Sequence, residues 1–277
     1  MSRIGECQLR ELRERLPQPP LSASIRTTNV WIIEWLPEAD RCTGQELHDW
    51  MTHQRPGWSC ITKCLNKDQV IAAIEAATEK AESTSFRPVL HIEAHGDTST
   101  QGLIGPSADL TRELLPWSEL TSPLQRLNSA TGCNLVVVVA ACTGFAGIQA
   151  LVEGPRAPAM ALVGTDADVS AMELFLGTKE LYRRWMDTHA NLDHAAESAS
   201  RELGSANFIV EPFCLMAYES LLVHLFNGAK EGRLPAASDL QHIWDEMFMM
   251  DLDRANYERF GLNWNSIVQQ IADGTAC

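Results

Sequence analysis

The segment NLVVVVAAC, from Asn134 to Cys142, constrains the fold of this chain more than any other stretch. Its four consecutive valines predict a strand, because β-branched side chains favour extended backbone. An unbroken apolar run further predicts a strand that is covered on both faces, as at the centre of a parallel sheet. The segment therefore predicts an α/β fold with this strand near the middle of its sheet.

Strand-like and helix-like segments alternate on both sides of this run. The other predicted strands are Asn29–Leu36, Ser59–Leu65, Arg87–Gly96, Pro158–Asp166 and Phe208–Leu215. The predicted helices are Gly44–Gln54, one capped by Asn66, Trp117–Asn128, Thr143–Leu151, one capped by Ser170, and Leu192–Leu203. A polar hairpin is expected between Asp97 and Leu115. The alternation predicts a mostly parallel sheet with helices on both faces.

The length and the proline pattern predict three regions. Residues 1–25 read as a short helix and a Pro-rich linker, because a helical pattern ends at Pro17, Pro19 and Pro20. Residues 26–218 are expected to form the α/β core, which is long enough to bury a large interior. Residues 219–277 read as a helical C-terminal extension that packs on the core.

Charge and hydropathy argue against two classes of partner. Acidic residues outnumber basic ones 36 to 22, and the net charge of −14 repels a nucleic acid strand. The longest apolar run, Leu135–Cys142, is too short to cross a bilayer, and the N-terminus lacks the apolar centre of a signal peptide. A cytoplasmic protein without a membrane partner is expected, in which the eight cysteines stay reduced.

Two chemically reactive residues stand at the ends of predicted strands: His95 in HIEAHGD and Cys142 in VVVVAACTG. In α/β sheets, ligand sites form beyond the carboxyl ends of the strands. If the two strands are parallel neighbours, His95 can take the proton of the Cys142 thiol, which becomes a nucleophile. The N–H groups of Gly96 and Cys142 are then expected to stabilise an oxyanion. This chemistry needs no metal and no cofactor.

These motifs resemble those of the caspase-like cysteine peptidases, especially the CHAT branch, which includes relatives of separase. The segments QGLIGPSADLTRELLPWSELTSPLQRLN and ALVGTDADVSAMELFLGTKELYRRW are similar to the connector and the later strand and helix of that family, so the resemblance covers roughly residues 86–205. It implies a caspase-like fold with His95 as general base and acid, Cys142 as nucleophile and Gly96 as an oxyanion donor. The expected substrate is a protein or peptide.

The resemblance also bears on specificity and regulation. Asp168 stands where separase-like relatives place an acidic residue in the specificity pocket, which would favour Arg or Lys at the cleaved bond; Asp166 is a nearby substitute. Ala140, expected to contact the substrate, stands two positions before Cys142 where metacaspases carry an aspartate, so the best-known acidic pocket of the family is missing. Bacterial relatives imply an antiphage or cell-death effector that is activated by a partner protein or a nucleotide signal.

Several alternatives stay open at this point. Cys142 could be a small buried hydrophobe and His95 a hydrogen-bonded core residue, in which case the chain is an idle caspase-fold binding or scaffold module. A nucleotide hydrolase is disfavoured, because the sequence has neither a Walker loop nor G-x-G-x-x-G. Glu93 could orient His95 or pair with His91, which is itself expected to serve packing, and Asp97 is expected to cap the hairpin.

Overall fold

The structure is a computed structural model that describes residues 25–213, apart from positions 26, 98, 110, 148–150, 152–156 and 188–190, together with a few positions after residue 213. Its contacts divide the chain into two units, Ile25–Phe213, and Met1–Ser24 with Cys214–Cys277. Every element below belongs to the first unit. The predicted N-terminal helix and nearly all of the predicted C-terminal extension lie outside the described residues.

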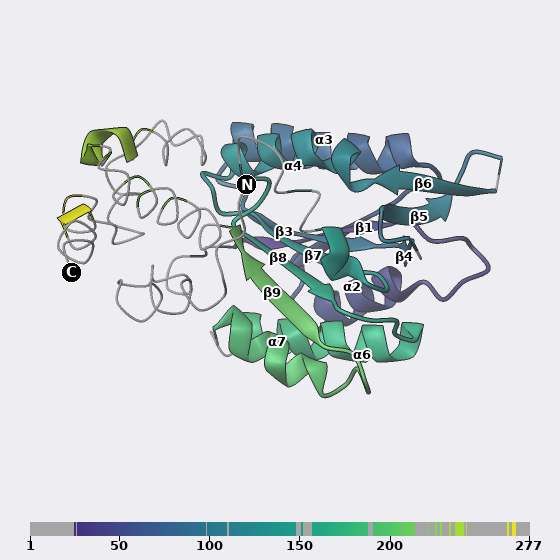
Figure 1. Cartoon of the computed structure of the whole chain (residues 1–277). Coiled ribbons are helices and arrows are strands. Elements are labelled where there is room, and N and C mark those ends of the chain that lie inside the picture. The colour runs from purple at the N-terminus through teal and green to yellow at the C-terminus, as the bar shows by residue number, and fades with distance from the viewer. Residues whose placement is uncertain are drawn as a thin grey trace. The chain divides into compact units, whose positions relative to one another are not determined.

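The first unit is built around a six-stranded sheet (Figure 1). Its strands are β1 (Asn29–Glu34), β2 (Ser59–Lys63), β3 (Pro88–Glu93), β7 (Val136–Ala140), β8 (Ala161–Thr165) and β9 (Phe208–Pro212). They are ordered β2-β1-β3-β7-β8-β9. All neighbours are parallel except β8 and β9, which are antiparallel. The predicted α/β class with a mostly parallel sheet is confirmed.

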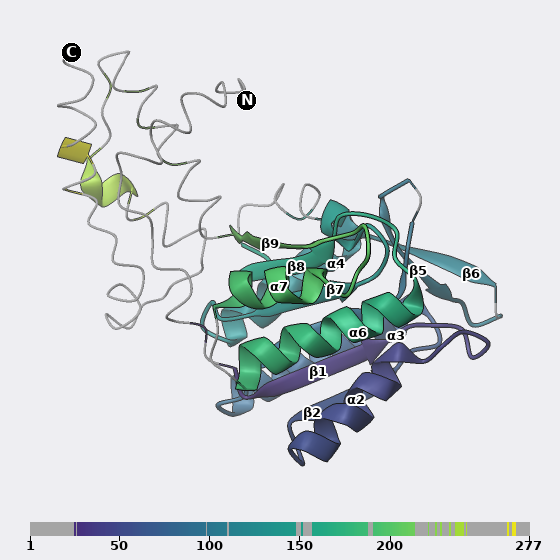
Figure 2. The ribbon, with the colours of Figure 1, turned by 90° about the horizontal axis from the view of Figure 1, so that it is seen from below.

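Helices cover both faces of the sheet. They are α2 (Thr43–Gln54), α3 (Lys67–Ser83), α4 (Trp117–Ala130), α6 (Ala171–Tyr182) and α7 (Leu192–Ser200). Helices α3 and α4 lie over one face, and α2, α6 and α7 lie over the other (Figures 1 and 2). The predicted caps are confirmed: Asn66 accepts a hydrogen bond from the N–H of Gln69, and Ser170 forms a capping box with Glu173. Within the described part of the chain, no helix has the length and hydropathy to cross a membrane.

Strand β7 lies between β3 and β8, as the valine run predicts, and all five of its residues are buried. Val136, Val138 and Ala140 belong to the core cluster that also contains residues of α6 and α7. Because side chains alternate along a strand, Val137 and Val139 face the opposite layer. Burial of each valine contributes about 1.5–3 kcal/mol, which fixes β7 in the interior.

A small antiparallel sheet branches from the end of β3. It contains β4 (His95–Gly96), β5 (Gly102–Pro106) and β6 (Arg112–Pro116), so the predicted hairpin is confirmed. The predicted helix Thr143–Leu151 is confirmed only in part: a 3₁₀ turn spans Gly144–Ala146, Gly147 and Leu151 are helical, and positions 148–150 lie outside the described residues. A further short π-helical turn, Arg183–Asp187, follows α6.

Candidate active site

The ends of β3 and β7 bring His95 and Cys142 to the same edge of the sheet. The two strands are parallel neighbours, and the last pair in their register is Glu93 with Ala140. His95 and Cys142 each follow two residues after that pair. The N–H of Ala94 still donates to the carbonyl of Ala140 at 3.4 Å, so the two segments stay side by side past the last pair of the register.

Gly96 and Cys142 are in direct backbone contact. A Cβ atom built on Gly96 would lie 1.8 Å from the carbonyl oxygen of Cys142 and 3.2 Å from its Cβ. No side chain fits at that distance, so only glycine allows the segment that follows His95 to approach Cys142 this closely. The contact places the predicted oxyanion donor beside the predicted nucleophile.

The pairing of β4 with β5 determines which way the N–H of Gly96 points. The N–H of Asp97 donates to the carbonyl of Gly102 at 3.2 Å, which makes these two residues a hydrogen-bonded pair. Hydrogen-bonded and non-hydrogen-bonded pairs alternate in an antiparallel ladder, so the next pair, Gly96 with Leu103, is non-hydrogen-bonded. The N–H of Gly96 therefore points away from β5.

The turn that carries Cys142 is held by hydroxyl groups. Thr165 donates to the carbonyl of Ala141, and Thr143 donates to the carbonyl of Cys142, both at 2.7 Å. Thr143 has φ = 51° and ψ = 28°, the left-handed conformation, which costs a residue with a Cβ roughly 1–2 kcal/mol. Backbone of this kind is concentrated at functional sites, where the surrounding contacts enforce it.

The segment before α6 lies against Cys142. The partly exposed thiol of Cys142 donates to the carbonyl of Val169 at 3.4 Å, and the N–H of Thr143 donates to the carbonyl of Ala167 at 3.2 Å. Asp168 stands between these two contact residues and is exposed. The predicted specificity residue therefore lies in a segment that contacts the predicted nucleophile.

The imidazole of His95 contacts a residue that the sequence did not single out. Nε2 of His95 lies 2.7 Å from Oδ2 of Asp40, and both side chains are 41% exposed. Asp40 belongs to the connection between β1 and α2, 55 positions before His95. Among the contacts of the described residues, no hydrogen bond joins His95 to the Cys142 thiol. The structure thus brings the two segments together with each side chain bound elsewhere.

The other two predicted substrate residues, Ala140 and Asp166, have contacts within the fold. Ala140 is 1% exposed within β7. The carboxylate of Asp166 accepts hydrogen bonds from the backbone N–H of Asn207 at 2.7 Å and from its side-chain amide at 3.1 Å, which joins the end of β8 to the start of β9. Their contribution to substrate binding stays a prediction.

Glu93 belongs to a buried hydrogen-bonded chain and not to His95. Its carboxylate lies 3.0 Å from Nε2 of His91 and accepts a 2.8 Å hydrogen bond from the hydroxyl of Thr43. Nδ1 of His91 lies 2.9 Å from the hydroxyl of Tyr182. Burial, and secondarily the charge of Glu93, raises the pKa of Tyr182 well above its usual value. This chain joins β3 to α2 and α6.

Asp97 caps the turn between β4 and β5, as expected. Its carboxylate accepts hydrogen bonds from the hydroxyl of Ser99 and, at 3.2 Å, from the N–H of Gln101. The hydrogen bond from Ser99 is the main cause that lowers the pKa of Asp97. These local contacts explain Asp97 without a catalytic role.

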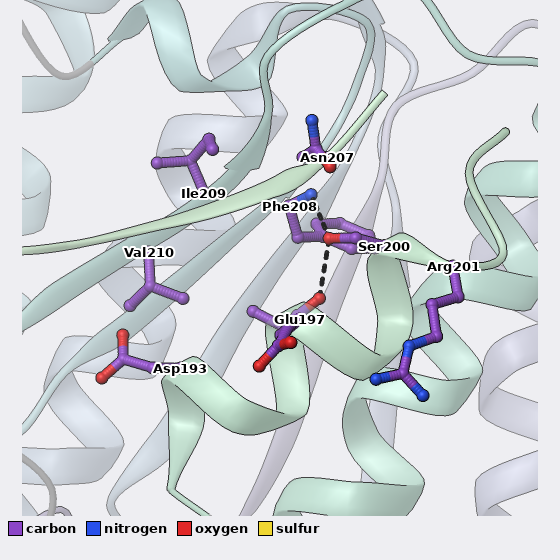
Figure 3. Close-up of a pocket in the computed structure, with 9 residues that line it drawn as sticks. Asp193, Glu197, Ser200, Arg201, Asn207, Phe208, Ile209 and Val210 are labelled. Atoms are coloured by element: carbon purple, nitrogen blue, oxygen red, sulfur yellow. Dashed lines mark hydrogen bonds between the residues drawn. The ribbon is translucent and has the colours of Figure 1, made fainter. Parts of the chain in front are cut away.

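A pocket of about 540 Å³ lies elsewhere, between α7 and β9 (Figure 3). Ser200 is central to its lining, and its hydroxyl accepts from the N–H of Phe208 at 2.9 Å and donates to the carbonyl of Ala196 at 2.8 Å. His95 and Cys142 belong to other elements, so this pocket is not the candidate active site. Over the described part of the chain, no group of three His, Cys, Asp or Glu residues could hold a metal ion.

Comparison with known proteins adds no family to this geometry. The sequence matches no protein-family model, and a search of curated proteins finds no similar sequence. The assignment of a function therefore depends on the arrangement of His95, Gly96 and Cys142 and on the motifs that contain them.

Proposed function

We propose that this chain is a caspase-like cysteine endopeptidase in which Cys142 is the nucleophile and His95 the general base and acid. The observation that carries the proposal is the contact of Gly96 with Cys142 at the ends of adjacent parallel strands. It joins the His-Gly and Ala-Cys-Thr-Gly motifs at one point of the fold. A reacting carbonyl at that point would lie close to a thiol, an imidazole and a backbone donor.

The reaction follows from these groups. His95 takes the proton of the Cys142 thiol, and the sulfur attacks the carbonyl carbon of the peptide while the π electrons move to oxygen. As the tetrahedral intermediate collapses, the C–N bond breaks and His95 gives its proton to the leaving amine. Water, deprotonated by His95, then attacks the thioester carbonyl; the C–S bond breaks, the acid is released, and the sulfur takes the proton back from His95.

One feature of the site supports this sequence of steps, and another must change before it begins. The N–H of Gly96 points away from β5, so it can donate to the developing oxyanion together with the N–H of Cys142. The thiol must leave the carbonyl of Val169 before it transfers its proton. Catalytic hydrogen bonds are commonly long or misaligned without substrate, and a side-chain rotation on substrate binding completes them.

The substrate class follows from the segment beside Cys142. The exposed carboxylate of Asp168 would pair with an Arg or Lys side chain next to the cleaved bond. As the resemblance implies, the peptidase would act in the cytoplasm, as an antiphage or cell-death effector held inactive until a partner protein or nucleotide signal binds.

A peptide library digested by the purified full chain tests the function, with activator candidates added singly. Wild type should cleave after basic residues, Cys142→Ala should abolish cleavage, and Cys60→Ala should match wild type because Cys60 lies on β2. Cleavage that survives Cys142→Ala would rule out the mechanism. If wild type cleaves nothing and a peptidyl chloromethyl ketone fails to label Cys142, the binding or scaffold module becomes the better interpretation.

A further inference from the structure

The contact between Asp40 and His95 determines which imidazole nitrogen remains for chemistry. Oδ2 of Asp40 lies 2.7 Å from Nε2 of His95, so a neutral ring donates its proton from Nε2 to this carboxylate. Nδ1 then has no proton and can accept one. A carboxylate that binds one nitrogen of a histidine in this way fixes both the tautomer and the orientation of the ring.

The loop that carries Asp40 is anchored where it leaves β1. The indole of Trp35 is buried, and its N–H donates to the carbonyl of Pro106 at 2.9 Å. The backbone N–H of Trp35 donates to the carbonyl of Glu93 at 2.8 Å, so the loop begins beside the end of β3. Because β3 leads directly to His95, this anchor fixes the start of the loop relative to the imidazole.

The loop is also anchored where it enters α2. The carboxylate of Glu34 accepts a hydrogen bond from the N–H of Gln45 at 2.8 Å, and that of Glu93 accepts one from the hydroxyl of Thr43. Glu34 and Glu93 are partners in the register of β1 and β3. The first turn of α2 is therefore attached to the same two strands, and the amide dipoles of the helix favour both carboxylates.

Contacts within the loop complete its support. The N–H of Asp40 donates to the carbonyl of Pro37 at 2.9 Å, which closes a turn. The next residue, Arg41, binds both carboxylate oxygens of Glu46 and lies over the ring of Phe175, 5.5 Å from its centroid. Asp40 thus stands in a loop that is held at both ends and by the contacts of the neighbouring Arg41.

We propose that Asp40 is a positioning residue of the candidate active site: it accepts the Nε2 proton of His95 and leaves Nδ1 to exchange a proton with the Cys142 thiol. The kinetic part of this inference rests on the proposed peptidase function, whereas the tautomer of His95 does not. The two parts are tested by different measurements.

The tautomer is measured by NMR on the full chain labelled with ¹⁵N-histidine, in a Cys142→Ala background that prevents self-digestion. The His95 signals are identified by their loss in a His95→Gln variant. At mildly alkaline pH, His95 should carry its proton on Nε2. Asp40→Asn should change the tautomer population, and Glu38→Gln, an equal change of charge at an exposed position of the same loop, should not. The inference is overturned if His95 carries its proton on Nδ1, or if Asp40→Asn leaves the tautomer population of His95 unchanged.

The kinetic test compares the same two substitutions in the chain with Cys142 intact. Asp40→Asn should lower kcat about 10- to 100-fold and leave KM within about twofold. This loss of kcat is smaller than the roughly 10⁴-fold loss on removing a buried triad aspartate, because the side chains of Asp40 and His95 are both 41% exposed. Asp40→Glu should restore part of kcat, and Glu38→Gln should match wild type. Equal kcat values for Asp40→Asn and Glu38→Gln overturn the positioning role while the peptidase stands. If no variant cleaves any substrate, the proposed function fails, and the NMR measurement still decides the contact.

Discussion

Adding one methyl group at Gly96 tests the contact on which the candidate active site depends. The Cβ of alanine would lie 1.8 Å from the carbonyl oxygen of Cys142, and real Cβ atoms do not come closer than about 3.0 Å, so the two segments must separate by at least about 1 Å. The movement costs free energy because both contacting groups are backbone, which cannot rotate away as a side chain can. Overpacking of this kind costs about 1–3 kcal/mol, and alanine recovers only about 0.4–1 kcal/mol through the unfolded chain.

Gly96→Ala should therefore lower the free energy of unfolding by about 1 kcal/mol in urea denaturation. A displacement of about 1 Å at the site should also reduce alkylation of Cys142 by a peptidyl chloromethyl ketone about 100-fold. Gly57→Ala is the control. A Cβ on Gly57 would have no atom within 4 Å, so this substitution causes no clash and costs only the strain of the left-handed backbone at φ = 78°, about 1 kcal/mol. If Gly96→Ala keeps the labelling rate of Gly57→Ala, the close approach of the two segments is refuted.

Two further predictions concern ionisation. Burial raises the pKa of Cys64 to about 12, so iodoacetamide at pH 8 should modify the partly exposed Cys142 long before Cys64. Peptide mass spectrometry measures the two modification rates, and equal rates would contradict the burial of Cys64. Glu180 has its pKa lowered to about 2, first by its hydrogen bond to Arg183, so its contribution to stability is present above pH 4.5 and is lost as the pH falls toward 2. Glu180→Gln should lower the free energy of unfolding by about 1 kcal/mol at pH 7, a value reduced for solvent screening because Arg183 is 45% exposed. The loss should become smaller in acid. If urea titrations show the same loss down to pH 2.5, the link between this ionisation and stability is wrong.

The sheet and the helix caps could be predicted because their signals are local. The valine run of β7 carries its own β preference and its own need for burial. A cap such as Asn66 or Ser170 acts on an N–H group three residues away, so sequence spacing and spatial distance agree. The position of His95 and Cys142 at one edge of the sheet followed from a rule about parallel sheets and did not depend on side-chain detail.

The part that could not be predicted is set by tertiary contacts. Asp40 meets His95 across 55 positions only because β1 and β3 are neighbours, and nothing in the local sequence marks Asp40 as a partner of His95. The helix expected from Thr143 does not begin there: a 3₁₀ turn comes first because Thr143 is left-handed, and α-helical backbone is described only at Gly147 and Leu151. A Cβ on Gly164 would lie 2.7 Å from the carbonyl carbon of Gly144, so crowding by β8 also shapes this turn.

The alignment of β7 along β3 has a consequence for how such a protein can vary. Sliding one strand by a single position moves it about 3.3 Å and turns every side chain to the opposite face, so intermediate alignments do not exist. A residue inserted or deleted between Val136 and Cys142 would carry the sulfur away from Gly96 in one step, whereas exchange of one valine for isoleucine would leave it aligned. Insertions and deletions are therefore tolerated only in the connections between strands. Within the strands, only the exchange of one apolar residue for another is tolerated.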